Sequence, residues 1–375
     1  MGYWYVSIDT LNTFCMDAFT AFGFDAEQAR VISDVLLRSD LYGIESHGMQ
    51  RMVRYHKGIE KGMIDVHAKP EIVFETPVSA VVDGHDGMGQ LIGRFCMDLS
   101  IRKAKTTGIS IVTARNSNHY GIAGYYAKLA SDAGFIGFSF TNSEAIMVPT
   151  YGRMAMLGSN PIACAMPAEP YDFLFDASTT VVTRGKLELY NKKNEPLPEG
   201  WALNKFGRPS IDAPDVLRNI VAKNGGGIMP LGGDGETLGS HKGYGYGVLC
   251  EIFTSILSLG MTSNYCMQGK KGGICHGFAA IDPSIFGDPQ AIRSHMSAFL
   301  RELRASPKAE NAERIYTHGE KEILAMEERL KNGVPVHGNT MAEVLDMCRY
   351  LGLDFNAYFG DCLPSDTKTG FAENY

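Results

Sequence analysis

The sequence predicts a mixed α/β protein in which a central part of alternating helices and strands is flanked by helical ends. Apolar residues recur at three- and four-residue steps over residues 8–62, as on one face of a helix. After Pro70, segments rich in β-branched residues alternate with helical segments, and from about residue 286 the chain is again charged, periodic and helical. We expect the two ends, 1–75 and 286–375, to pack together as one helical lobe beside an α/β domain of residues 76–285.

Two apolar stripes predict the N-terminal helices. The first consists of Leu11, Phe14, Cys15, Phe19 and Phe22, and the second of Ala29, Ile32, Val35 and Leu36. Each stripe lies on one helix face, so each helix is expected to bury that face against another element.

The central elements follow in order along the chain. IVFETPVSAVVDG has the β-branched composition of strands and ends in a turn. FCMDLSIRKAKTTG is typical of a helix that ends at Gly108, and IAGYYAKLASDAG of a helix with Gly134 as its C-cap. ISIVTAR and FIGFSFTN are typical of short strands, with NSNHYG as a loop after the first. Residues 190–245 contain many Gly, Pro, Asn and Asp, which indicates a loop-rich surface before a helix at 243–260.

Composition narrows the class of protein. The 375-residue chain is 45% hydrophobic and 21% charged, as in ordinary globular proteins. Its net charge of −7 gives no general attraction to nucleic acid or anionic membrane, and no apolar run is long enough to span a bilayer. The start lacks the features of a signal peptide, so we expect a cytoplasmic protein. Eight scattered cysteines without a C-x-x-C pair are expected to be reduced thiols: Cys15, Cys96, Cys164, Cys250, Cys266, Cys275, Cys348 and Cys362.

A first candidate cluster lies in the segment SHGMQRMVRY. With Ser46 as N-cap, a helix beginning at His47 places His47, Arg51 and Tyr55 on one face. A guanidinium suits bidentate carboxylate binding, and an imidazole beside it can exchange a proton. By spacing alone, a solvated amphipathic face is the commoner origin of such a pattern, and Arg54 is expected on a solvated face rather than at a second acidic group.

Three further clusters carry polar groups at the starts of expected helices. In NSNHYG, His119 follows a strand and precedes a helix, where α/β proteins often place reactive groups, although it equally suits a helix cap. In FDASTT, Asp176 and the hydroxyl residues after it suit an N-cap or an anion site. In GSHKGYG, Lys242 among glycines suits a phosphate.

The glycine-rich segment Gly87–Gly93 imitates a nucleotide-binding loop. Its spacing is G-x-G-x-x-x-G, and no strand with an acidic end follows at the expected distance. We expect a turn before a helix, and hence no Rossmann fingerprint in the chain.

Taken in order, these pieces resemble the malate/L-lactate dehydrogenase family of the second, non-Rossmann type. The matching segments cover nearly the whole chain: DLYGIESHGMQRMVRY, NSNHYGIAGYYA, LGSNPIACAMP, FDASTTVVTRGKLELY, GWALNKFGRP and SHKGYGYGVLCEIF. Relatives in this family include ureidoglycolate, sulfolactate and diketogulonate oxidoreductases and reductases of cyclic imino acids. The resemblance implies a largely antiparallel sheet in a domain that binds NAD or NADP, with NAD favoured, a helical lobe made of both chain ends, and a homodimer.

The resemblance also implies site residues. His119, His47 and Arg51 match catalytic and substrate-binding positions, and Ser46 and Tyr55 of the first cluster are further candidates for substrate binding. Nucleotide contacts are expected from His119 and from Ser143, Asp176, Ala177, Ser178, Thr179, Lys242, Gly319 and Glu320. His318 stands where the family usually has proline, so the chain departs from the family's pattern at 318–320. The tail SDTKTGFAENY resembles a flexible addition.

We therefore expect hydride transfer between NAD(P) and C2 of a small 2-hydroxy or 2-keto acid, with no metal required. Arg51 would hold the C1 carboxylate, and His119, ahead of His47, would exchange the hydroxyl proton. We expect both imidazoles to titrate near neutrality, His119 less burdened than a His47 at a helix start beside Arg51. A pyridoxal-phosphate enzyme using Lys242 and an inactive binding protein are the alternatives from other classes.

Overall fold

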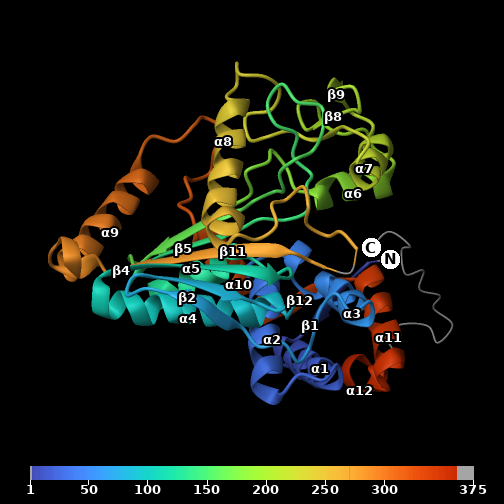
Figure 1. Cartoon of the computed structure of the whole chain (residues 1–375), viewed down its shortest axis with the longest axis horizontal. Helices are drawn as coiled ribbons and strands as arrows, with labels where there is room; N and C mark the ends of the chain where they lie inside the picture. The colour runs from blue at the N-terminus through green and yellow to red at the C-terminus, as the bar shows by residue number, and fades with distance from the viewer. Residues whose placement is uncertain (1, 270, 361–375) are drawn as a thin grey trace.

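The computed structural model describes residues 2–269 and 271–360 (Figure 1). Cys362 and the expected flexible tail lie outside the described residues. The helices are α1 (Ile8–Ala21), α2 (Ala26–Leu41), α3 (Met52–Glu60), α4 (Gly89–Thr107), α5 (Ala123–Asp132), α6 (Arg184–Lys193), α7 (Ala213–Ala222), α8 (Ser240–Glu251), α9 (Pro289–Ala305), α10 (Glu320–Asn332), α11 (Gly338–Leu351) and α12 (Phe355–Phe359). The strands are β1 (Tyr3–Val6), β2 (Glu71–Glu75), β3 (Ser79–Asp83), β4 (Ile109–Ser117), β5 (Ile136–Thr141), β6 (Ile162–Met166), β7 (Phe173–Ala177), β8 (Ala202–Leu203), β9 (Pro209–Ser210), β10 (Gly227–Ile228), β11 (Ile274–Ile281) and β12 (Val334–His337).

A seven-stranded sheet forms the centre of the described structure. Its strand order is β2-β3-β4-β11-β5-β6-β7, and every neighbouring pair is antiparallel except β3–β4. Helices α4 and α5 cover one face, while α8 rises from the other (Figure 1). The mixed α/β prediction is confirmed. Because the chain does not alternate strand and helix through a parallel sheet, it lacks the crossover geometry of a doubly wound fold.

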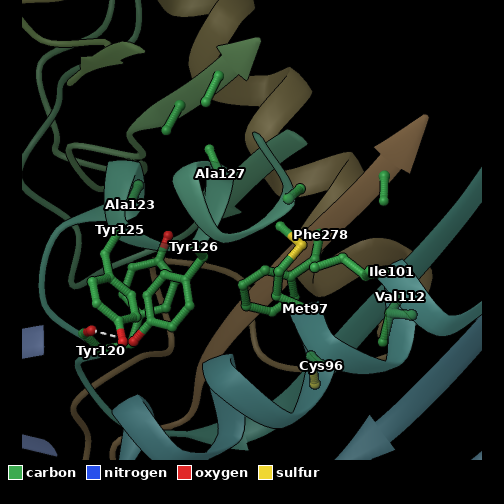
Figure 2. Packing of buried hydrophobic residues seen from close by; sticks show 14 of the residues in the cluster. Cys96, Met97, Ile101, Val112, Tyr120, Ala123, Tyr125, Tyr126, Ala127 and Phe278 are labelled. Carbon is green, nitrogen blue, oxygen red and sulfur yellow. Dashed lines mark hydrogen bonds between the residues drawn. The ribbon is translucent and has the colours of Figure 1, made fainter. Parts of the chain in front are cut away.

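The main core lies between the sheet and helices α4 and α5. Tyr120 stacks on Tyr126 with ring centroids 4.5 Å apart, and Tyr126 meets Phe278 edge to face at 5.6 Å (Figure 2). The Tyr126 hydroxyl donates to the carbonyl of Tyr120 at 2.6 Å, so the buried phenol is satisfied. This packing fixes the chain immediately after His119.

A second core joins the two ends of the chain. Apolar residues of α1 and α2 pack with those of β12, α11 and α12, and β1 pairs antiparallel with β12. The division into 1–75 with 286–375 and 76–285 stays a prediction. Helix α9, which falls inside the range 286–375, is bonded instead to the loop before β7, where Ser297 Oγ accepts from the Glu169 N–H at 2.9 Å.

Helix ends follow the local chemistry that the sequence offers. Asp25 caps α2 in a reciprocal capping box with Gln28. Gly108 ends α4 with a φ of 80°, which glycine adopts without steric strain. No helix of the described part is both long and apolar enough to cross a membrane.

The structure adds to one expectation about elements and corrects two others. The range 190–245 is rich in loops, as expected, but α7 and the small sheet β10-β8-β9 also give it a core of its own. Strands β1 and β12 fall inside segments expected to be helical or left unassigned. No helix begins at His47: two 3₁₀ turns, Glu45–His47 and Met49–Arg51, precede α3.

Candidate active site

The loop after β4 carries His119 and is held from below by Asn118. The Asn118 amide donates to three backbone carbonyls, those of Met63, Asp86 and Gly87, at 2.9–3.0 Å. The start of α4 closes against the same loop, because a Cβ at Gly89 would overlap the carbonyls of Asn118 and His119. Glycine is therefore required at position 89 by this close approach.

His276 supports the loop from within the core, and no sequence pattern had singled it out. Its Nε2 lies 2.8 Å from Ser117 Oγ and 3.2 Å from the Asn118 carbonyl, and its Nδ1 lies 2.8 Å from Thr141 Oγ1. The ring stacks on Tyr120 with centroids 4.3 Å apart. Burial lowers the pKa of His276 to about 3, so it is a neutral support.

The predicted catalytic side chains gather around His119. Tyr55 Oη lies 2.8 Å from His119 Nδ1, and the ring of His47 lies 5.4 Å from that of His119. Ser46 Oγ in turn holds His47 Nδ1 at 2.9 Å. Each imidazole thus has one nitrogen held by a hydroxyl, and the partly exposed side chains leave Nε2 for a ligand.

The segment bearing His47 and Arg51 turns sharply, because of Asp40 and Gly48. Asp40 is buried, its carboxylate accepts from the Met49 N–H at 2.8 Å, and a Cβ at Gly48 would overlap that carboxylate. Burial raises the pKa of Asp40 to about 7. Gly48 has a ψ of −138°, which interrupts the helix that Ser46 was expected to cap. The prediction of one helix face was wrong, yet His47 and Tyr55 still meet at His119.

Arg51 is oriented by the same turn. Its Nε donates to the carbonyl of Ser46 at 2.5 Å. No other hydrogen bond or ion pair reaches its guanidinium within residues 2–269 and 271–360, so both terminal nitrogens remain for a ligand. This arrangement presents the two-pronged edge that a carboxylate accepts.

The two imidazoles are neutral in the free protein. Burial, then Arg51 and Arg54, lower the pKa of His47 to about 3. Burial, then Arg54, His47, Arg51 and His276, lower the pKa of His119 well below its ordinary value. The expectation that both titrate near neutrality was wrong, and so was the expectation that His119 is the less burdened. The reason is that both rings are buried and that Arg51 and Arg54 act on both of them, while no helix begins at His47.

Asp176 lies in β7, and its carboxylate reaches the start of α5, the helix that follows the His119 loop in the sequence. Its carboxylate accepts from the Gly124 N–H at 2.6 Å. Burial raises the pKa of Asp176 to about 6, against the lowering effect of that hydrogen bond. Asp176 stands inside β7, so the expectation that it caps a following helix was wrong. It instead occupies the N-terminus of α5, where the helix dipole favours a negative charge.

The remaining hydroxyl candidates form a connected group. Ser143 Oγ accepts from the Ser159 N–H at 3.1 Å, and the Ser159 carbonyl accepts from the N–H and Oγ1 of Thr179 at 2.9 and 3.0 Å. Ala177 and Ser178 lead from β7 into this group, and Ser178 Oγ donates to the Thr180 carbonyl at 3.2 Å. Ser159, which links the group, lies in LGSNPIACAMP and was not singled out from the sequence.

Lys242 lies on the first turn of α8 and is exposed. Leu231 links α8 to Thr179: Gly243 of α8 lies against the backbone of Leu231, and the Leu231 N–H donates to the Thr179 carbonyl at 2.9 Å. The N-terminus of α8 has no side-chain cap. An exposed cation on an uncapped helix start suits a phosphate.

Gly319 and Glu320 lie against the beginning of β7. The Leu174 N–H donates to the carbonyl of His318 at 3.2 Å, and Gly319, the N-cap of α10, has a φ of 95°. The Glu320 carboxylate already pairs with Arg314 and accepts from the Thr317 N–H. The turn therefore keeps its place beside β7 with His318 in it, whose ring contacts Phe173 and Phe175.

A turn at residues 85–86 precedes α4, as predicted, but the helix already begins at Gly89 and so takes up most of the glycine-rich segment 87–93. Its helix start faces the carbonyls of Asn118 and His119. Carbonyl oxygens at that position disfavour a phosphate, which agrees with the expectation that this segment is not a nucleotide-binding loop.

Known proteins resemble this chain over nearly its whole length. A profile of the malate/L-lactate dehydrogenase family matches residues 6–345. Malate dehydrogenase of Pyrococcus horikoshii is 43% identical over 348 residues, 92% of this chain and 95% of that protein. L-sulfolactate dehydrogenase of Methanocaldococcus jannaschii is 34% identical over 92% of this chain and 96% of that protein.

The fold agrees with solved structures of such proteins. The structure of malate dehydrogenase from Entamoeba histolytica superposes with a TM-score of 0.90 at 35% identity, covering 94% of this chain and 99% of that one. These findings leave the pyridoxal-phosphate alternative without support. The chain belongs to the malate/L-lactate dehydrogenase family.

Proposed function

We propose that this protein is a nicotinamide-dependent dehydrogenase that interconverts a small 2-hydroxy acid and its 2-keto acid, with malate as the first candidate substrate. The observation that carries the proposal is the group of His119, Tyr55, His47 and Arg51, which places two imidazoles beside a guanidinium with free terminal nitrogens. The likeness to malate dehydrogenases supports the choice of malate.

Arg51 binds the C1 carboxylate and thereby orients C2. The bond from Nε to the Ser46 carbonyl fixes the guanidinium plane, so little side-chain freedom is lost when the acid binds. A lysine at this position cannot hold the carbonyl and present two parallel donors at once.

His119 exchanges the proton of the C2 oxygen. Burial raises the pKa of Tyr55 to about 12, so its hydroxyl stays protonated and remains a fixed neutral partner of Nδ1. Nε2 then takes the hydroxyl proton in oxidation and returns it in reduction. A substrate carboxylate beside Arg51 offsets the part of the lowering that Arg54 and Arg51 add to burial, and so raises the pKa of His119 toward its ordinary value.

The residues present fit a nicotinamide nucleotide. The hydroxyls of Ser143, Ser178 and Thr179 suit contacts to the ribose and the carboxamide of the nucleotide. The start of α8, with Lys242, suits its phosphates. When bound, the nucleotide exchanges a hydride with C2 of the substrate. Asp176 lies at the α5 end nearest the His119 loop, where its carboxyl can accept from or donate to the nucleotide. NAD is favoured over NADP from the resemblance alone.

We further propose a homodimer, in a cytoplasmic setting. Large apolar side chains are exposed along α8 and the π-helical turn Ile252–Ile256 that follows it: Tyr246, Leu249, Ile252, Ile256 and Leu257. A row of this kind is typical of a surface covered by another protein. Sedimentation equilibrium that returns twice the chain mass of 41.0 kDa supports the dimer, and a monomer contradicts it.

A panel of 2-keto acids and cyclic imines, each assayed with NADH and with NADPH, tests the proposed function. We expect nucleotide oxidation with oxaloacetate and slower or no oxidation with a cyclic imine. A protein that binds the nucleotide but turns over no member of the panel would instead support the inactive binding protein.

A further inference from the structure

Glu251 ends α8 and carries a buried carboxylate without a cationic partner. The residue is 5% exposed. The described part of the chain gives it no lysine or arginine as a partner, and all its donors are amides and hydroxyls. A carboxylate withdrawn from water is costly unless hydrogen bonds replace the water that it loses. The groups that supply these bonds therefore indicate what the residue does.

Each oxygen of this carboxylate accepts from one asparagine and one serine. Oε2 accepts from Asn142 Nδ2 at 3.3 Å and from Ser255 Oγ at 2.5 Å. Oε1 accepts from Asn160 Nδ2 at 3.0 Å, from the Ser263 N–H at 3.3 Å and from the Ser263 hydroxyl. A carboxylate accepts at both oxygens, whereas a glutamine would turn its own N–H groups toward one of these sets of donors. The surroundings of Glu251 thus match a glutamate and not its amide.

The two asparagines come from different segments, and both side chains are fixed. Asn142 directly follows β5; its Nδ2 also donates to the Met261 carbonyl at 2.9 Å, and its Oδ1 accepts from the Cys275 N–H at 2.8 Å. Asn160 lies just before β6 and is buried, with a φ of 37° that asparagine tolerates better than most residues. Its Nδ2 also donates to a carbonyl of α8 at 3.1 Å. The carboxylate therefore joins the end of one strand to the beginning of the next.

Both asparagines adjoin hydroxyls that we propose as nucleotide contacts or their support. Ser143 follows Asn142, Ser159 precedes Asn160, and the Ser159 N–H donates to Ser143 Oγ at 3.1 Å. The two segments also meet closely at Gly158, where a Cβ would overlap Ser143 Oγ and Asn160 Oδ1. A shift of either asparagine would therefore displace the hydroxyl next to it.

We propose that Glu251 is a positioning residue for nucleotide binding. It holds Asn142 and Asn160 so that the hydroxyls beside them keep the spacing that the nucleotide requires, and it ties them to α8, whose first turn carries Lys242. This inference rests on the proposed function and adds a support behind its nucleotide site. No hydrogen bond joins Glu251 to His119 in the described structure, so its loss acts on the nucleotide rather than on the substrate.

The test measures the dissociation constants of NADH and NADPH for Glu251→Gln by fluorescence titration without substrate. The glutamine releases one of the two asparagines, so the dissociation constant of the nucleotide that the unmodified protein binds more tightly rises about tenfold or more. Electrostatics alone predicts the opposite, because loss of a negative charge favours an anionic nucleotide. At saturating nucleotide, KM for oxaloacetate changes less than about threefold, since Arg51 and His119 keep their contacts.

A second variant and a control complete the test. Asn160→Gly keeps the positive φ and removes the amide that Glu251 holds, so it raises the same dissociation constant and carries the test if the glutamine variant does not fold. The control is Thr254→Ala, in the π-helical turn that follows Glu251, where a buried hydroxyl donates to the Cys250 carbonyl at 2.6 Å. It lowers the melting temperature and leaves both dissociation constants unchanged.

An unchanged dissociation constant in a folded Glu251→Gln or Asn160→Gly protein overturns the positioning role. A rise of the same size in Thr254→Ala, or equal losses in nucleotide binding and in KM for oxaloacetate, overturns it as well. An unmodified protein that binds neither NADH nor NADPH overturns the proposed function and this inference with it.

Discussion

Replacing His276 by phenylalanine isolates the pH dependence of one buried imidazole. The substitution keeps a ring against Tyr120, at the position now stacked 4.3 Å away, and removes the titrating group. The folded-state pKa of His276 is lowered to about 3, mainly by burial, whereas an unfolded chain has an ordinary value of about 6.5. Below pH 6.5 the imidazole of residue 276 is protonated in the unfolded state but stays neutral in the folded state. The free energy of unfolding that this group contributes above pH 6.5 is therefore lost as the pH falls.

The size of the effect follows from the two pKa values. At pH 5 an unfolded imidazole is about 30 times more protonated than neutral, while His276 in the fold remains neutral. Thirtyfold is about 1.5 decades, or about 2 kcal/mol of unfolding free energy lost between pH 8 and pH 5. The result changes little for any folded pKa below about 4. The raised pKa values of Asp40 and Asp176 act in the opposite direction, but they are the same in both proteins and cancel in the difference.

The assay is urea unfolding at pH 8, 7, 6 and 5. His276→Phe is less stable at pH 8, because Ser117 and Thr141 lose a buried partner, but it loses about 2 kcal/mol less than the unmodified protein on going to pH 5. His295→Phe, at an exposed position, leaves the pH dependence unchanged. Parallel curves for His276→Phe and the unmodified protein would refute the argument that His276 stays neutral in the fold.

Three further predictions concern the site. Arg51→Lys lowers kcat/KM by about 30-fold or more and retains the melting temperature. A near-normal kcat/KM contradicts the role of Arg51 in binding the C1 carboxylate. Tyr55→Phe lowers kcat about tenfold, because His119 Nδ1 loses its hydroxyl partner, and this loss vanishes in a His119→Asn background. Additive losses in the double variant contradict the claim that Tyr55 acts through His119. Lys242→Gln raises the dissociation constant of the nucleotide, measured by fluorescence titration without substrate, several-fold; an unchanged constant removes Lys242 from the phosphate site.

The sequence predicted the elements whose signals are local. Gly108 ended its helix as expected, since a positive φ there depends on neighbouring residues alone. The strand around Val112 and the helix around Tyr126 could also be predicted, because the apolar pattern of each segment is typical of one type of element only.

The site itself depends on contacts that no local pattern records. The break at Gly48 requires the carboxylate of Asp40, which comes from a different helix. Likewise, Asp176 was expected to cap a helix that follows it, but the helix start it occupies is that of α5, which precedes it by some fifty residues. His276 lies in a strand whose sequence gives it no distinction, and only the pairing of β11 with β4 and β5 places it under His119.

The choice between His119 and His47 tests the account most directly, and it is decided by the pH dependence of kcat in two variants. We expect His119→Asn to lower kcat by about 10²–10⁴-fold, as for loss of a general acid–base. It should also abolish the near-neutral limb of the pH profile, which is the change of kcat with pH around neutrality. His47→Asn is expected mainly to raise KM and to keep that limb, since Ser46 and not a buried tyrosine holds its imidazole. A limb that survives in His119→Asn and disappears in His47→Asn would contradict the account and give the proton to His47.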